Sequence, residues 1–165
     1  MTEERRRRRG VAADPWTAAI GIVCLVALAI RLHDVTTPLW VDEIYSYVAA
    51  RAGPAEILAN SRLDPHPPLF YLLGWLLSLG GRLTSEAAWR WFPVVCGTLV
   101  VPLVWRIARP VAGRPVALLT ALVAATAPEL LYLSQDFRPI VLATTLAAVG
   151  AWLTMRMLVG APSRR

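Results

Sequence analysis

The sequence has few charged residues, no lysine and only two cysteines. Charged residues make up 17% of the 165 positions and hydrophobic residues 56%, whereas a soluble domain is usually about one-quarter charged. This composition excludes an ordinary cytosolic domain, and the high apolar content excludes a disordered chain. Cys24 and Cys96 both lie inside apolar runs, which argues against a disulfide framework or a cysteine-based metal motif.

The basic charge is concentrated in one short segment. All 17 basic side chains other than histidine are arginines, and the run Arg5–Arg9 supplies five charges of the net +6. The remainder of the chain is nearly neutral, so it lacks the basic face that a nucleic-acid-binding protein needs. Because the run precedes a long apolar segment, we interpret it as a cytoplasmic topology signal that contacts anionic lipids.

Long apolar runs dominate the rest of the chain. We predict about four transmembrane helices, since each run approaches the ~20 residues that cross a bilayer; their ranges are 16–33, 91–108, 115–133 and 139–158. No small-x-small cleavage site follows the first run, so we favour an uncleaved span over a signal peptide. The predicted fold is an all-α polytopic protein of the plasma membrane with a cytoplasmic amino terminus.

These spans divide the chain into three parts. We predict a basic cytoplasmic tail over 1–15, a membrane domain over 16–159 and a cytoplasmic end over 160–165. The longest polar stretch, 34–90, becomes an outer loop between the first two spans. We expect the functional residues in this loop and in the turn that separates the last two spans.

Two short helices are predicted within the outer loop. Over 40–52, Trp40, Ile44 and Val48 belong to an apolar stripe at helical spacing, which indicates an amphipathic helix at the membrane surface. Asp42 falls on a different face and can therefore look into a cavity. The apolar run over 68–80 is too short to cross a bilayer and predicts a re-entrant or interfacial helix.

Two acidic motifs in the loop each allow two interpretations. Asp42 is a candidate general base for a hydroxyl, but Asp42 and Glu43 together also suit the first turn of a helix, where they complement its dipole. Asp64 and His66 lie in a proline-stiffened segment that either holds a ligand or a divalent metal or forms a rigid turn. Two such side chains fall short of the three or four ligands that a metal site needs.

Two arginines also allow two interpretations each. Arg138, in the turn between the last two spans, is a candidate clamp for a phosphate group; the alternative is a simple turn with an Arg138–Asp136 ion pair of little strength. Arg31 ends the first span on the outer side, where it either meets a lipid phosphate or extends toward the head groups.

Four motifs in order resemble those of a known enzyme class. The chain reads WVDE at 40–43, HPPLFY at 66–71, EAAWRWFP at 86–93 and YLSQDFRPI at 132–140. In order and spacing this resembles the GT-C class of membrane glycosyltransferases, in particular the family 39-like group of protein O-mannosyltransferases, aminoarabinose transferases and RgtA/B/C/D-like enzymes. The last motif differs: Asp136, Phe137 and Ile140 stand where the group has Glu, Ala and Tyr.

The resemblance implies a function for the outer face of the membrane. It implies transfer of a sugar from a polyprenyl-phosphate carrier to an acceptor hydroxyl, with Asp42 as the catalytic residue. The candidate substrate-binding residues are Glu43, Asp64, His66, Arg138 and Arg31. Glu43 is assigned a structural or supporting part, and a divalent metal is the one cofactor considered.

Members of this group are longer, so we expect the chain to correspond to their amino-terminal part as a truncated product, inactive alone or completed by a second chain. A catalytically inert polytopic protein, either a remnant or an assembly partner, is the alternative.

Overall fold

The computed structural model describes residues 14–63 and 66–160. Within these ranges the chain forms seven helices and no strand, which confirms the all-α prediction. The helices are α2 (Pro15–Arg31), α3 (Val41–Arg51), α4 (Pro54–Asn60), α5 (Leu69–Leu77), α6 (Glu86–Thr126), α7 (Pro128–Gln135) and α8 (Pro139–Gly160).

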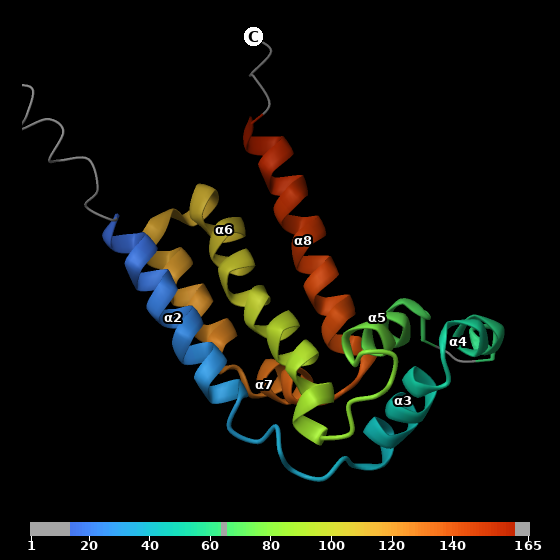
Figure 1. The fold of residues 1–165 in the computed structure, drawn as a ribbon. Coiled ribbons are helices and arrows are strands. Elements are labelled where there is room, and N and C mark those ends of the chain that lie inside the picture. The colour runs from blue at the N-terminus through green and yellow to red at the C-terminus, as the bar shows by residue number, and fades with distance from the viewer. Residues whose placement is uncertain (1–13, 64–65, 161–165) are drawn as a thin grey trace, which may run out of the picture.

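The longest helix, α6, consists of two arms that fold back on each other at Gly113 (Figure 1). Gly113 has φ 79° and ψ 171°, a conformation that glycine adopts without steric cost. Val101 and Ala125 belong to one buried cluster, although a straight helix would hold them about 36 Å apart. The fold of α6 thus provides the reversal expected between the runs 91–108 and 115–133.

The hairpin of α6 packs against α2 on one side and α8 on the other (Figure 1). Its contact with α2 is built from small residues, with Ala27 of α2 buried in one cluster with Ala117 and Ala121 of α6. Small side chains let apolar helices approach closely, as in membrane proteins. The α8 helix is much less covered, with only 11% of its apolar window buried within the protein.

Two of the described helices, Glu86–Thr126 and Pro139–Val159, are long and apolar enough to cross a membrane, and Pro15–Arg31 is a shorter apolar helix. The segment 115–133, predicted as one span, is divided between α6 and α7. Ala127 separates them in an extended conformation with ψ 122°, because the ring of Pro128 disfavours the helical conformation in the preceding residue. The count of four spans therefore stays a prediction.

The shorter helices α3, α4, α5 and α7 gather at one end of the bundle (Figure 1). They enclose an aromatic cluster in which Phe137 contacts Phe70 and Trp89, with ring centroids 4.7 and 5.1 Å apart. The helix α4 was not predicted from the sequence. The signal was present in the pair Gly53-Pro54, because proline is favoured in the first turn of a helix. In the structure Gly53 precedes that turn with φ 92°.

Candidate functional site

A pocket of about 710 Å³ opens at the end of the bundle where the short helices meet. We call it the polar pocket, because its lining includes three of the predicted site residues, Asp42, His66 and Arg138. They come from α3, from the segment before α5 and from the turn between α7 and α8. The fold therefore brings together side chains that are far apart in the sequence.

Asp42 and Arg138 form an ion pair in this pocket, with Nη1 of Arg138 3.3 Å from Oδ2 of Asp42. The Asp42 side chain is 44% exposed and that of Arg138 25% exposed. Both charged groups can therefore be reached from the pocket. The partner of Arg138 is Asp42 and not Asp136, whose backbone carbonyl accepts a hydrogen bond from the Arg138 N–H at 2.9 Å.

Glu43 fixes the position of this ion pair from behind. Its carboxylate is fully buried and accepts hydrogen bonds from the Phe137 N–H at 2.8 Å and from the Trp40 N–H at 3.2 Å. Glu43 follows Asp42 in the sequence and Phe137 precedes Arg138, so this bond joins the neighbours of the two pocket residues. One buried carboxylate thereby holds the α7–α8 turn in register with α3.

Arg90, at the start of α6, completes this buried network. Its Nε donates to Glu43 Oε1 at 2.8 Å, and its Nη2 pairs with Glu43 Oε2. The same guanidinium also donates to Thr37 Oγ1 at 2.9 Å and to the Pro38 carbonyl at 3.2 Å. Arg90 lies in the motif at 86–93, but no role was predicted for it. The available signal was a charge beside an apolar run, because such a charge requires a partner when it is buried.

Arg31 is not part of the polar pocket. It is fully buried, and its Nη atoms donate to the carbonyls of Ala27 and Ala125 at 3.1 Å and of Ala124 at 3.2 Å. Its Nε donates to Ser134 Oγ at 3.2 Å. These carbonyls belong to the last turns of α2 and α6, where a cation is stabilised by the helix dipoles.

Substrate binding by Glu43 and Arg31 stays a prediction, because the structure describes only their contacts within the protein. Neither side chain has exposed surface in this structure, and their polar atoms are used by protein partners. Their geometry gives them a structural part, with Glu43 holding α3 against the α7–α8 turn and Arg31 holding the ends of α2 and α6 together.

Asp136 is a further buried carboxyl group near the pocket. It is only 8% exposed, and Oδ2 has no hydrogen-bond partner among the described residues. Burial, and then the negative charge of Glu43, raise the pKa of Asp136 above its usual range, against the opposing effects of Tyr132, Arg90 and Arg138. This carboxyl therefore retains its proton to a higher pH than an exposed aspartate.

The remaining predicted residues have different outcomes. Asp64 lies outside the described residues, so its place relative to His66 is not described. Among the described residues, no group of three or more His, Cys, Asp and Glu side chains is arranged to hold a metal ion. Two polar residues of α4, Glu56 and Asn60, also line the polar pocket; they were missed because α4 itself was not predicted.

Comparison with known proteins gives one match. The family model described as dolichyl-phosphate-mannose-protein mannosyltransferase matches residues 65–161, which is more than half of the chain. The match covers His66, Arg90 and the turn with Arg138, and it begins after α3. The searches of curated proteins and of solved structures gave no match.

Proposed function

The chain belongs to the dolichyl-phosphate-mannose-protein mannosyltransferase family, a group of membrane glycosyltransferases, and on this premise we propose that its polar pocket serves sugar transfer. The donor is a sugar on a polyprenyl-phosphate carrier, and the acceptor is a hydroxyl group at the outer face of the plasma membrane. The observation that carries the proposal is the Asp42–Arg138 ion pair at 3.3 Å in an accessible pocket.

The two charges of this pair suit the two halves of the transfer. The acceptor oxygen attacks the anomeric carbon of the sugar while Asp42 takes the hydroxyl proton. The bond from that carbon to the phosphate oxygen breaks, and the departing phosphate carries its electron pair to the side of Arg138. A guanidinium group stabilises such charge with parallel hydrogen bonds.

The pairing also suggests an order of events. Before the carrier arrives, Asp42 and Arg138 neutralise each other. A carrier phosphate competes with Asp42 for Arg138, and the Asp42 carboxylate is then released to accept a hydrogen bond from the acceptor hydroxyl. Arg138, with 25% of its side chain exposed, can make this exchange without unfolding the turn that carries it.

The other predicted residues support these two. His66 lines the same pocket, and we propose that it and Asp64 shape the acceptor side of the site. Glu43 and Arg31 act as positioning residues, because their buried hydrogen bonds hold α3, α7 and the ends of α2 and α6 in place. A divalent metal is not needed for this scheme.

The test is sugar transfer by membranes of cells that produce the chain, in which a second chain that completes it would be present, supplied with polyprenyl-phosphate mannose and a hydroxyl acceptor. We expect Asp42→Asn to lower the transfer rate by about 10²–10⁴-fold, which is typical for loss of a positioned base. The matched control is Asp34→Asn, since Asp34 is also exposed but pairs with His33 outside the pocket.

Two outcomes would contradict the proposal. Near-normal transfer by Asp42→Asn would remove Asp42 from its role as base. Transfer by these membranes no greater than by membranes of cells that lack the chain would favour the inert polytopic protein.

A further inference from the structure

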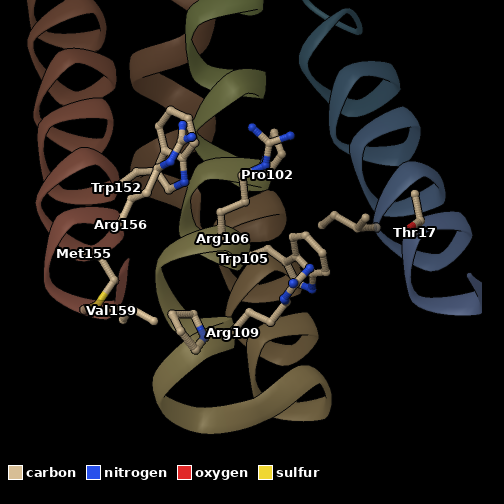
Figure 2. A pocket seen from close by; sticks show the side chains of 11 residues that line it. Thr17, Pro102, Trp105, Arg106, Arg109, Trp152, Met155, Arg156 and Val159 are labelled. Atoms are coloured by element: carbon tan, nitrogen blue, oxygen red, sulfur yellow. The ribbon is translucent and has the colours of Figure 1, made fainter. Parts of the chain in front are cut away.

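A second pocket, of about 650 Å³, lies at the opposite end of the helical bundle. Figure 2 shows it between α2, α6 and α8, with three arginine side chains entering from two of these helices. Arg106 and Arg109 come from the first arm of α6, and Arg156 comes from α8. We call it the arginine pocket.

Aromatic rings hold the three guanidinium groups in place. The guanidinium carbons of Arg106 and Arg156 lie 5.5 and 5.9 Å from the centre of the Trp152 ring, and that of Arg109 lies 5.2 Å from the ring of Trp105. Cation–π contacts of this kind orient a guanidinium without using its N–H donors. The donors thus stay available to a ligand.

The positive charge of this pocket has no counter-charge within it. Its lining includes no aspartate or glutamate, and no carboxylate of the described residues is within ion-pair distance of these arginines. Three cations gathered in one hollow repel each other, and an anion placed between them would relieve that repulsion. The arrangement therefore favours a negatively charged ligand.

A buried donor points to the same type of ligand. Trp105 is only 7% exposed, and its indole N–H has no hydrogen-bond partner among the described residues. A buried N–H group without a partner is costly. Trp105 lines the arginine pocket, so a small shift of its indole ring would let an oxygen of a bound anion accept a hydrogen bond from this donor.

The surroundings indicate that the anion is attached to a lipid. The pocket walls include the apolar side chains of Ile20, Met155 and Val159, and the pocket lies between apolar helices. Its place near the fold of α6 and the carboxyl end of α8 (Figure 1) corresponds to the head-group level if these helices cross a bilayer. Basic pockets between transmembrane helices on the cytoplasmic side are typical sites for anionic head groups.

We propose that the arginine pocket binds the phosphate group of an anionic phospholipid, with its acyl chains lying along α2 and α8. The guanidinium groups of Arg106, Arg109 and Arg156 hold the phosphate oxygens by charge-assisted hydrogen bonds. The site is independent of the polar pocket, and its lipid is bound without being altered.

The experiment measures lipid binding to the purified full chain by native mass spectrometry, with phosphatidylglycerol and phosphatidylcholine as probes. We expect phosphatidylglycerol to bind more tightly, and millimolar inorganic phosphate not to displace it. Arg106→Gln/Arg156→Gln should weaken phosphatidylglycerol binding by roughly tenfold or more. The matched control is Arg62→Gln/Arg82→Gln, which removes the same charge at exposed positions outside the pocket and should leave binding within about twofold.

A second variant keeps the test valid if the double substitution disturbs folding, as judged by circular dichroism. Trp105→Phe keeps an aromatic ring against Arg109 and removes the indole N–H together with part of the ring, so binding should weaken by at least about fivefold, the effect of one lost hydrogen bond. Equal binding of the two lipids, or equal losses in the two double variants, would overturn the proposal. Displacement of the lipid by inorganic phosphate would instead indicate a site for a free anion.

Discussion

The two pockets lie at opposite ends of one helical bundle and differ in whether their arginines are paired with carboxylates. In the polar pocket Arg138 faces Asp42 at 3.3 Å, and Glu43 and Arg90 form a buried pair directly behind them. In the arginine pocket three guanidinium groups face aromatic rings and no carboxylate of the described chain. Paired charges hold backbone segments in register, whereas unpaired charges attract a ligand.

The difference also separates residues that position from residues that bind. Arg90 and Arg138 both lie at the end of the bundle that holds the polar pocket, but the Arg90 side chain is 4% exposed and that of Arg138 is 25% exposed. A fully buried arginine donates its N–H groups to protein acceptors and holds their backbone segments in place, whereas a partly exposed arginine can exchange partners. The following predictions test this contrast, from the largest effect to the smallest.

The largest expected effect concerns the two sides of the membrane. In a background lacking Cys24 and Cys96, a cysteine at Leu63, which is 87% exposed at the polar end, should react with a membrane-impermeant reagent on intact cells. A cysteine at Ala112, beside the fold of α6, should react only after permeabilisation. The reason is that α5, with 9 residues, is about 14 Å long and cannot cross a ~30 Å hydrocarbon core. Labelling of both cysteines on intact cells, the pattern expected if α5 crossed, would contradict the predicted topology, and so would the reversed pattern.

The next largest effect compares a buried ion pair with an exposed one. Arg90→Gln leaves the fully buried Glu43 without its cation, which should lower the free energy of unfolding by about 3–5 kcal/mol. Arg114→Gln, at the other end of the bundle, breaks an ion pair with Asp14 in which the Arg114 side chain is 49% exposed and the Asp14 side chain 39% exposed. This substitution should lower the free energy of unfolding by about 0–1 kcal/mol. Denaturant titration followed by circular dichroism measures both. Similar values for the two variants would show that the Glu43–Arg90 network does not hold the polar end together.

A smaller effect should follow from two glycine substitutions. A Cβ atom at Gly97 would overlap Ser134 Oγ and lie 3.4 Å from Arg31 Nε, so Gly97→Ala should destabilise the protein by about 1–3 kcal/mol. At Gly150 of α8 an added Cβ meets nothing within 4 Å. Gly150→Ala should therefore be neutral or stabilising by up to about 1 kcal/mol, as in an open helix position. Thermal unfolding distinguishes the two, and equal shifts would contradict the close packing of α6 against α7.

The smallest effect depends on pH at Asp136. Its folded-state pKa lies above the ordinary value of 3.8 because of burial, so the ionised carboxyl disfavours the folded state. This penalty is absent at a pH below 3.8, grows as the pH rises from 3.8 to the folded-state pKa, and is constant at higher pH. The melting temperature of Asp136→Asn relative to the unaltered chain should therefore increase from about pH 3.5 to pH 7. A constant or decreasing difference would contradict the inferred pKa.

Phospholipid binding at the arginine pocket, which has no Asp, Glu or His in its lining, should stay constant over the same range.

Local patterns in the sequence predicted most of the helices and the candidate residues, but not α4 (Pro54–Asn60). Apolar runs predicted an all-α chain, and the helices α3 (Val41–Arg51) and α5 (Leu69–Leu77) lie inside the predicted ranges 40–52 and 68–80. The types and positions of Asp42, His66 and Arg138 selected the residues that line the polar pocket. Such features depend on near neighbours in the chain, so a single sequence can reveal them.

Partners across the fold could not be read in this way. Asp42 pairs with Arg138 only because the α7–α8 turn packs against α3. Glu43 likewise accepts its hydrogen bonds from Arg90 and Phe137, which are remote in sequence. The arginine pocket likewise takes Arg106 from one helix and Arg156 from another. Hydrophobic periodicity determines where helices form, but only their packing decides which charges become buried pairs and which remain open to a ligand, because desolvation and ion pairing depend on distances in space.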